Sequence, residues 1–418
     1  MKTYEDLANY IFPEISETIA DLEKKYPERN LPEGAEVTRF APSPTGFLHL
    51  GSLFTSLVAA KAAHDTKGIF YFRLEDTDTK REVEGSADDL VNQLAYFGIN
   101  PDEGYLLGKD VGAYAPYKQS DRAYIYKVCI KELMKQGRAY PCFCSAEQLE
   151  ETRQIQEAMK MIPGYYGEYA ICRTLTPDEA IAKIEAGEKY VIRFKSNGNH
   201  NNKVTFHDEI RGDISIAEND MDIVILKSDG LPTYHFAHAV DDHFMRTTTV
   251  MRGEEWIATW PIHIQLFAAM GWDMPEFCHN TVLMKIDEET GQKRKLSKRH
   301  DPELSLDYYR KLGYHPAAVR EYLLTILNSN YEEWRMENPD ASIDEFEFTT
   351  EKMSSDGALF DLDKLNDVSK DTLVRIPAAQ LRKFMADWAL EFKPEIAHYF
   401  TDDEAYIEKI LDLGRSGE

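Results

Sequence analysis

The sequence predicts an α/β protein whose parallel sheet is split by an insertion and followed by helical modules. Residues 36–42 and 69–76 form two short apolar segments, rich in β-branched and aromatic residues, with little of the alternation typical of a half-exposed strand. A stretch with helical periodicity follows each of them. The order strand, helix, strand, helix favours a parallel sheet with right-handed crossovers.

Punctuating residues delimit the elements of the first third of the chain. Residues 1–35 predict a helical N-terminal extension, which the proline-rich "YPERNLPEG" closes. Between the two strands, an apolar stripe at residues 53–68 predicts a helix that ends at a glycine. A second stripe at residues 83–97 predicts the helix after the second strand, and it too is followed by a glycine.

The pattern changes after about residue 115. Residues 121–137 and 145–161 predict helices within a mixed, loop-rich insertion. The apolar segment 221–230 predicts a core strand that returns to the sheet, and residues 256–272 predict an apolar helix after it. From about residue 287 the chain is helical and polar.

Composition excludes several classes of protein. The chain has 418 residues, 43% of them hydrophobic, which is enough for sizeable cores. Its formal net charge of −25 argues against binding of nucleic acid by bulk electrostatic attraction, so any phosphate site must be a local group of basic residues. Five cysteines argue against a disulfide framework. Glu5 and Asp6 near the start argue against a signal peptide, and the lack of an 18-residue apolar run argues against a membrane span. We therefore expect a cytoplasmic protein.

Two short segments suggest phosphate chemistry. In "RFAPSPTGFLHLGS", residues 39–52, prolines and a glycine define a loop between a strand and a helix, where His49 and Gly51 could approach a phosphate at the helix start. In "KRKLSKR", residues 293–299, five basic residues share one loop, and Lys295, Ser297 and Lys298 could clamp a triphosphate. The alternatives are an ordinary turn and a solvated charge run.

Together the two segments resemble the two signature loops of class I aminoacyl-tRNA synthetases. "FRLEDTD" (72–78), "DGLPTYHFAHAVDDH" (229–243) and "VMRGEEW" (250–256) narrow the resemblance to bacterial-type glutamyl-tRNA synthetase, over residues 36–375. The resemblance implies a Rossmann-type sheet and helical tRNA-binding modules. It also implies an enzyme that activates L-glutamate with ATP and Mg²⁺, charges tRNA(Glu), usually activates glutamate only when tRNA is present, and acts as a monomer.

The resemblance assigns roles to individual residues. His49, Lys295 and Lys298 are the expected catalytic residues. The expected ATP-binding residues are His49, Gly51, Ser52, Lys295, Ser297 and Lys298. The expected glutamate-binding residues are Arg39, Ala41, Ser43, Glu75, Tyr234, His238 and Arg252.

These assignments agree with the chemistry of glutamate, which has two carboxylates and one ammonium. Arginine grips carboxylates through a planar fork, so Arg39 and Arg252 suit them, whereas Glu75 suits the ammonium and Tyr234 can close the pocket. The structural alternatives are ion pairs of Arg39 with Asp76 or Asp78 and of Arg252 with Glu254 or Glu255, with Glu75 at a helix start and Tyr234 in the core. The chain departs from the family pattern at His238, where some members have asparagine.

The resemblance also supports a division of the chain. The expected segments are an N-terminal extension (1–35), the first half of the catalytic domain (36–114), an acceptor-stem-binding insertion (115–220), the second half of the catalytic domain (221–286), a stem-contact region with the KLSKR loop (287–360) and the start of a helical anticodon-binding region (361–418). Residues 371–392 predict one amphipathic helix and 402–418 part of another. Because family members carry a further anticodon-binding stretch, we expect a truncated or unusually short chain.

Metal binding is not expected from the sequence. Some family members bind zinc in the insertion through Cys-x-Cys and a later Cys-x-His. This chain has Cys142, Cys144 and Cys172, but Thr174 stands where the histidine would be. Tyr169 is a speculative fourth ligand, so three reduced thiols are the preferred interpretation and zinc is not expected.

Three other interpretations fit the sequence less well than glutamyl-tRNA synthetase. Glutaminyl-tRNA synthetase would be expected to have glutamate before the second proline, whereas this chain has "APSPTG". A short tRNA-modifying paralogue would stop near the catalytic domain, and a non-catalytic tRNA-binding relative would have lost His49, Lys298 or Arg252. "EKMSSDG" at 351–357 imitates the second signature, but Ser355 replaces its second lysine.

Overall fold

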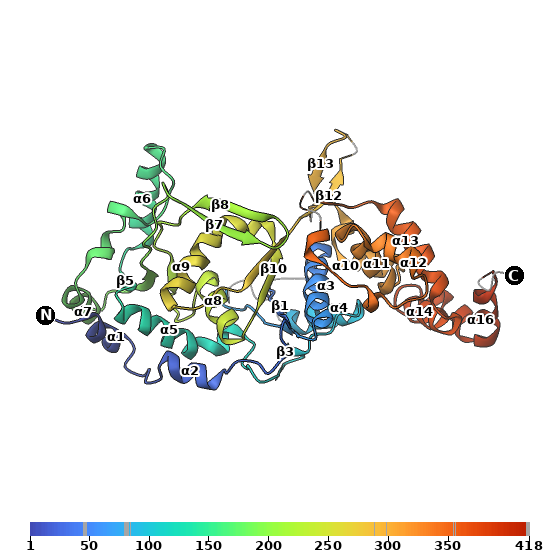
Figure 1. Ribbon diagram of the computed structural model, residues 1–418, viewed down its shortest axis with the longest axis horizontal. Coiled ribbons are helices and arrows are strands. Elements are labelled where there is room, and N and C mark those ends of the chain that lie inside the picture. Colours follow the sequence, from blue (N-terminus) through green and yellow to red (C-terminus); the bar gives the residue numbers. More distant parts are fainter. Residues whose placement is uncertain are drawn as a thin grey trace.

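A computed structural model describes residues 1–44, 48–78, 83, 85–287, 289–297, 299–353, 355 and 357–414. The molecule is elongated, with the two termini at opposite ends of its long axis (Figure 1). The N-terminal helices and the insertion form one end, the parallel sheet lies in the middle, and the C-terminal helices form the other end. Within the described part of the chain, no helix is long and apolar enough to span a bilayer.

The central sheet confirms the α/β fold class. Strands β1 (Val37–Phe40), β2 (Ile69–Phe72) and β3 (Glu103–Leu106) are parallel, and β4 (Lys109–Val111) closes the edge antiparallel to β3. A second parallel pair, β10 (Thr249–Gly253) and β11 (Glu276–Asn280), comes from the far side of the insertion. The backbone N–H of Thr248 donates to the carbonyl of Val37 at 3.0 Å, which places β10 beside β1.

Helices cover the sheet and contribute to two large hydrophobic cores. The helix after β1 is α3 (Leu50–Asp65), and the helix after β2 is α4 (Ser86–Tyr96). Because side chains alternate along a strand, Phe70 and Phe72 join the core shared with α3, α4 and the C-terminal helices, whereas Tyr71 joins the core shared with the N-terminal helices and the insertion. The second core includes residues of α1 (Tyr4–Ile11), α2 (Ile19–Lys25), α5 (Ala123–Lys135), α7 (Pro177–Glu185), α8 (Tyr234–Phe244) and α9 (Trp260–Met270).

The insertion contains a small sheet of its own. Its strands β5 (Ala139–Cys142) and β6 (Val191–Phe194) are antiparallel, and α6 (Ala146–Ala158) and α7 (Pro177–Glu185) lie between them in sequence. The expectation that segment 221–230 returns to the parallel sheet is wrong. Its strand β9 (Val224–Leu226) pairs antiparallel with β6. A hairpin, β7 (Lys203–Asp208) and β8 (Gly212–Ala217), lies against β11.

The C-terminal third is helical, as expected, with one small sheet. Its strands are β12 (Leu283–Ile286), β13 (Lys293–Lys295) and β14 (Ala358–Leu359). Its helices are α10 (Leu306–Leu312), α11 (Pro316–Leu327), α12 (Tyr331–Glu337), α13 (Leu362–Arg375), α14 (Ala378–Phe392), α15 (His398–Thr401) and α16 (Glu404–Asp412). The single helix expected over 371–392 is two helices, because Pro377 cannot continue a helix and restricts the residue before it.

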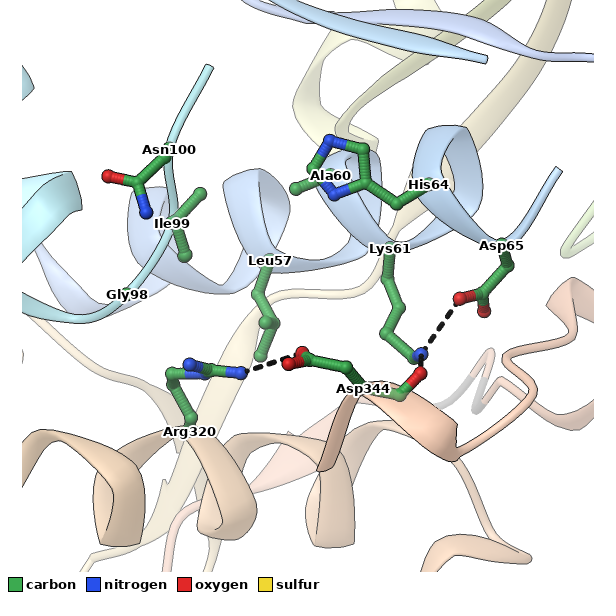
Figure 2. Close-up of a pocket in the computed structure, with 10 residues that line it drawn as sticks. All are labelled: Leu57, Ala60, Lys61, His64, Asp65, Gly98, Ile99, Asn100, Arg320 and Asp344. Atoms are coloured by element: carbon green, nitrogen blue, oxygen red, sulfur yellow. Dashed lines mark hydrogen bonds and ion pairs between the residues drawn. The ribbon is translucent and has the colours of Figure 1, made fainter. Parts of the chain in front are cut away.

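A cavity of about 300 Å³ lies where α3 meets the C-terminal helices (Figure 2). The Lys61 ammonium, from α3, lies 2.8 Å from Asp65 and 3.0 Å from the carbonyl oxygen of Asp344. Arg320, from α11, donates to the Asp344 carboxylate at 3.1 Å. These bonds tie the helix that begins at the HLGS loop to the C-terminal region.

Candidate active site

The HLGS loop forms the N-terminus of α3. His49 is the N-cap, and the backbone N–H of Ser52 donates to its Nδ1 at 3.2 Å. The Ser52 hydroxyl lies 3.1 Å from Nε2 of the same ring. A Cβ atom at Gly51 would approach that ring to 3.2 Å, so glycine leaves room for the histidine over the helix start. The first turn of α3 holds no acidic residue, and its N–H groups favour an anion.

The KLSKR loop is anchored by groups that the sequence did not single out. The backbone N–H of Ser297 donates to Asp301 at 2.7 Å, and Arg294 pairs with the same carboxylate, also at 2.7 Å. Lys295 is exposed at the end of β13, and the buried Ser297 hydroxyl has no partner among the described residues. Lys298 lies outside the described residues, so its role remains a prediction.

The two signature loops come together in the fold. His49 forms an isolated antiparallel bridge with Ser305, which follows the KLSKR loop by a few residues. Leu48 and Leu296, one from each loop, are buried in the same hydrophobic core. The structure therefore brings a helix N-terminus and a basic loop to one place, as a triphosphate site requires.

Arg39 ends in a buried polar cluster. Its Nε lies 3.3 Å from the Asp242 carboxylate, its Nη1 donates to the carbonyl of Met251 at 3.3 Å, and its Nη2 lies 3.3 Å from Nδ1 of His238. Although burial alone would raise it, the charges of Arg39 and Arg73 hold the pKa of Asp242 well below its usual range. The carboxylate that Arg39 contacts therefore comes from α8, and the sequence-based alternative did not consider it.

Glu75 lies beside the first loop rather than at a helix start. Its backbone N–H donates to the carbonyl of Pro42 at 2.9 Å, which fixes it next to Ala41 and Ser43. Arg73 donates to its carboxylate at 3.0 Å, and burial raises the pKa of Glu75 against the lowering effect of the nearby guanidinium groups. Ala41 is half-buried and Ser43 is exposed.

Arg252 is held by two histidines and not by a neighbouring glutamate. Its Nε donates to His279 at 3.0 Å and its Nη1 lies 3.1 Å from Nδ1 of His263. Glu254, which sequence proximity offered as a partner, pairs with Arg211. Nη2 of Arg252 is buried and has no acceptor within the residues that the structure describes. This guanidinium nitrogen can therefore donate to an acceptor from outside the chain, and a carboxylate is the acceptor that an arginine binds most strongly.

Aromatic side chains complete this cluster at the start of α8. The Tyr234 and His238 rings are stacked at 5.7 Å between centroids, and Trp256 lies 4.4 Å from Tyr234. Burial lowers the pKa of His238 to about 3, so its imidazole is neutral. Its Nε2 is buried and has no partner in the described part of the protein. Two polar atoms, one on His238 and one on Arg252, thus lack a partner beside one aromatic wall.

Three residues important to this cluster were missed by the sequence reasoning. Asp242, His263 and His279 hold the arginines but received no role. The sequence did contain one signal, because Asp241 and Asp242 stand side by side among apolar residues and histidines, and a buried carboxylate must be paired. The two histidines gave no such signal, since only the register of β10 with β11 and the packing of α9 bring them to Arg252.

Comparison with known proteins identifies the family. Residues 36–367 match the family model described as tRNA synthetases class I (E and Q), catalytic domain. This match covers both signature loops, the parallel sheet and the buried cluster. The chain belongs to the class I tRNA synthetases.

Curated relatives of this synthetase share most of its length. It is 53% identical over 416 residues to a glutamate–tRNA ligase of Acetivibrio thermocellus, which covers 99% of this chain and 76% of the relative. It is 51% identical over 417 residues to a glutamate–tRNA ligase of Clostridium perfringens strain 13, with the same shares covered.

A solved structure has the same fold as this synthetase. The crystal structure of a glutamate tRNA ligase from Elizabethkingia meningosepticum, in complex with its amino acid, has a TM-score of 0.78 and 33% sequence identity. The match covers 92% of this chain and 77% of that chain. The fold class and the family that the motifs indicated are confirmed.

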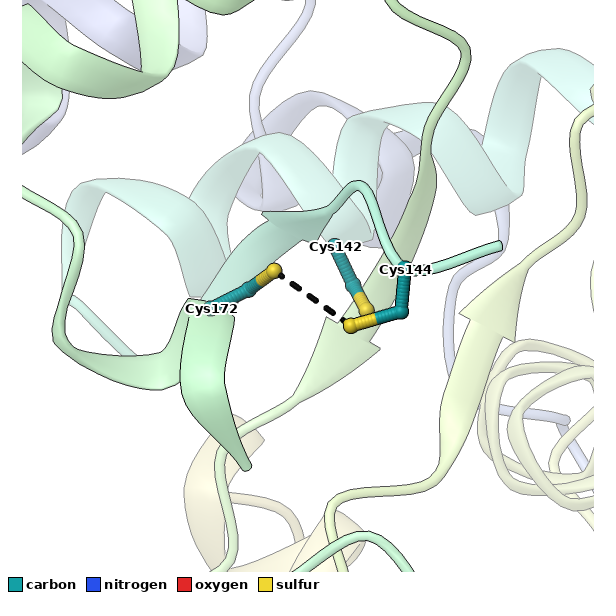
Figure 3. Close-up of side chains that lie close together, drawn as sticks. All are labelled: Cys142, Cys144 and Cys172. Atoms are coloured by element: carbon teal, nitrogen blue, oxygen red, sulfur yellow. Dashed lines mark hydrogen bonds between the residues drawn. The ribbon is translucent and has the colours of Figure 1, made fainter. Parts of the chain in front are cut away.

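The insertion of the synthetase brings three thiols together (Figure 3). The sulfur atoms of Cys142, Cys144 and Cys172 all lie within 4.8 Å of one another. The Tyr165 hydroxyl lies 3.3 Å from the Cys144 sulfur. Hydrogen bonds from Cys172 and Tyr165 lower the pKa of Cys142 to about 4.

Tyr169, the speculative fourth ligand of the sequence analysis, is not the tyrosine that lies beside these thiols. The Tyr169 hydroxyl points instead to the sulfur atoms of Met159 and Met161, at 3.5 and 3.7 Å. Tyr165 supplies the phenol that lies beside the cysteines, and its hydroxyl also accepts the backbone N–H of Cys172 at 3.0 Å.

Proposed function

We propose that this synthetase is a glutamate–tRNA ligase that activates L-glutamate with ATP and transfers it to the 3′ end of tRNA(Glu). Its identity of 53% to a curated glutamate–tRNA ligase carries the choice of amino acid. The buried Arg252, whose Nη2 lacks an acceptor, supports it, because glutamate brings two carboxylates into the pocket.

The glutamate lies among the residues of the buried cluster. Arg39 and Arg252 receive its carboxylates, and Glu75 receives its ammonium group. Tyr234 and His238 form the aromatic wall, and Ala41 and Ser43 border the pocket from the first loop. The pairing of Arg39 with Asp242 holds that guanidinium in place before the substrate arrives.

ATP, accompanied by Mg²⁺, lies at the start of α3. His49, Gly51 and Ser52 contact the nucleotide there, and Lys295, Ser297 and Lys298 contact its phosphates. A glutamate carboxylate oxygen attacks the α-phosphorus, and the bond to the β-phosphate breaks, which gives glutamyl-adenylate and pyrophosphate. A ribose hydroxyl of the tRNA then attacks the acyl carbon, and AMP leaves. Positioning and charge stabilisation are the protein's contribution to both steps.

The setting and the division of labour belong to the same proposal. The synthetase acts in the cytoplasm as a monomer. The insertion (115–220) holds the acceptor stem, residues 287–360 hold the neighbouring part of the tRNA stem, and residues 361–418 belong to the region that faces the anticodon. The extension (1–35) supports the insertion, because α1 packs against α5 and α7.

The cysteine group fits a structural zinc ion better than the sequence alone suggested. The argument against zinc was the missing fourth ligand, and Tyr165 provides an oxygen donor beside three sulfur atoms. Cys142, Cys144, Cys172 and Tyr165 would hold the ion, which would cross-link the end of β5 to the segment before α7.

The proposed activity is tested by ATP–pyrophosphate exchange. We expect exchange with glutamate in the presence of tRNA(Glu), exchange near background with glutamine, and exchange near background without tRNA. Exchange that is faster with glutamine than with glutamate would favour the glutaminyl enzyme. Exchange with neither amino acid, by a folded protein that still binds tRNA, would favour a non-catalytic relative.

A further inference from the structure

The guanidinium of Arg252 is fixed from two sides by neutral imidazoles. Arg252 and His279 are directly paired residues of the parallel strands β10 and β11, so their side chains start from neighbouring positions on one face of the sheet. Nε of Arg252 donates to Nε2 of His279 at 3.0 Å, and Nη1 lies 3.1 Å from Nδ1 of His263 on α9. An arginine only donates, so each contacting histidine nitrogen must present a lone pair.

A carboxylate fixes the tautomer of His279. Nδ1 of His279 lies 2.7 Å from Oδ2 of Asp208, and both side chains are fully buried. With its proton on Nδ1, the ring donates to Asp208 and leaves Nε2 free to accept from Arg252. Burial lowers the pKa of His279, which keeps the ring neutral.

Asp208 is itself held by four donors. The backbone N–H of His279 reaches Oδ2 at 3.0 Å, in addition to the ring nitrogen. The backbone N–H groups of Ile210 and Arg211, in the turn of the β7–β8 hairpin, reach Oδ1 at 3.1 and 3.0 Å. Every neighbour donates, so only a carboxylate satisfies this position.

We propose that His279 is a positioning residue for amino-acid binding. Held by Asp208, it accepts the Nε–H of Arg252 and sets the plane of the guanidinium so that Nη2 faces the substrate carboxylate. An arginine side chain has many rotamers, and an unsupported one loses that freedom only when the substrate binds. The support removes this cost in advance. The inference rests on the proposed function, in which Arg252 receives a carboxylate of glutamate.

The test measures KM for glutamate and for ATP separately, in aminoacylation of tRNA(Glu). His279→Leu removes the acceptor, and we expect the glutamate KM to rise about tenfold or more while the ATP KM changes less than about twofold. His279→Gln restores it, because one amide can accept from Arg252 and donate to Asp208. We expect its glutamate KM to lie within about threefold of the wild-type value.

Two further variants distinguish the positioning role of His279 from the role of Arg252 on which it rests. If His279 acts through Arg252, Arg252→Ala alone and Arg252→Ala with His279→Leu should have the same glutamate KM. A selective effect of Arg252→Ala without one of His279→Leu would overturn the positioning role and leave the proposed function standing. No selective effect of Arg252→Ala would overturn both the positioning role of His279 and the contact of Arg252 with the substrate carboxylate. His243→Leu, which removes a partly buried histidine paired with Glu23 at 2.7 Å, is the matched control and should leave both KM values unchanged.

A measurement on the unaltered protein covers the case in which His279→Leu does not fold. Nitrogen NMR of the ¹⁵N-histidine-labelled protein, with His279→Gln used to assign the signal, reports which ring nitrogen carries the proton. We expect a neutral His279 ring protonated on Nδ1 at about pH 7.5. A proton on Nε2 would overturn the inference, because that nitrogen could not accept from Arg252.

Discussion

Arg73 donates a hydrogen bond of 2.6 Å to Asp242, and neither side chain has any exposed surface. Asp242 also lies 3.3 Å from Arg39, so one carboxylate compensates two buried guanidinium groups. Asp242→Ala leaves both without this partner, and we expect the free energy of unfolding in urea to fall by about 3–5 kcal/mol.

An exposed ion pair provides the comparison for Asp242. Lys183 and Glu188 lie 3.0 Å apart with both side chains about 40% exposed. We expect Glu188→Ala to lower the free energy of unfolding by less than about 1 kcal/mol. Equal losses in the two variants would mean that the buried network contributes no more than a surface pair.

Lys298 carries the prediction for the phosphate step. If its ammonium stabilises the departing pyrophosphate, Lys298→Ala should lower the rate of ATP–pyrophosphate exchange about 10²-fold or more. Folding should change little, since Leu296 is the one residue that the described part of this loop contributes to the core. Lys293→Ala, an exposed lysine on the adjoining strand, is the control and should retain normal exchange. Near-normal exchange by Lys298→Ala would contradict the role of Lys298 in stabilising pyrophosphate.

The buried histidines predict how stability depends on pH. Burial lowers the pKa of His235 to about 4 and that of His238 to about 3, and it lowers the pKa of His263 well below its usual value. Between these values and about pH 6.5, the three histidines are therefore protonated in the unfolded chain but neutral in the folded protein. Stability is complete above about pH 6.5 and falls as the pH drops towards 4, by at most about 1.4 kcal/mol per histidine for each pH unit.

The measurement is the thermal midpoint of unfolding at pH 7.5 and at pH 5.5. His238→Asn should show a smaller fall than the wild type, since it removes one such histidine. The pKa of His64 is raised by its hydrogen bond with Asp102, so His64 contributes stability at low pH, and His64→Gln should steepen the fall. A midpoint that is independent of pH in all three proteins would contradict the buried neutral state of these rings.

The cysteine group predicts the metal content. We expect protein purified without added metal to contain about one zinc ion per chain, and Cys172→Ser and Tyr165→Phe to contain less. Cys129→Ala, which changes a buried cysteine of α5, should keep the wild-type content. Wild-type protein without zinc, with all three thiols reactive after denaturation, would restore the interpretation as free cysteines.

The sequence predicted those elements whose signal is local. β1, β2 and α3 could be predicted because apolar runs and helical stripes report burial directly. The signature loops could be predicted because each is a short motif of consecutive residues. The partners of the arginines could not be found in this way. His279 meets Arg252 only through the register of two strands, and Asp242 meets Arg39 across 203 positions of sequence.

Two errors have different physical causes. β9 carries the apolar composition of a strand, but composition does not say which strand it pairs with, and β6 competes for it against the parallel sheet. The expected helix over 371–392 breaks at Pro377, where the apolar periodicity continues on both sides although the backbone turns. Periodicity therefore indicated helical structure on both sides of Pro377 and missed the interruption.

The hairpin of β7 and β8 limits how freely the parts of this chain can be exchanged. An inserted segment is often regarded as a cassette that evolution or an engineer can swap while the surrounding enzyme stays intact. Here Asp208 belongs to the insertion, whereas the ring that it holds belongs to β11 of the sheet. A chimaera with a foreign insertion would keep its strands and its signature loops, yet it would lose affinity for its amino acid unless the donor segment supplied a carboxylate at the same place. An exchange of the insertion should therefore leave the β7–β8 hairpin of the host enzyme in place.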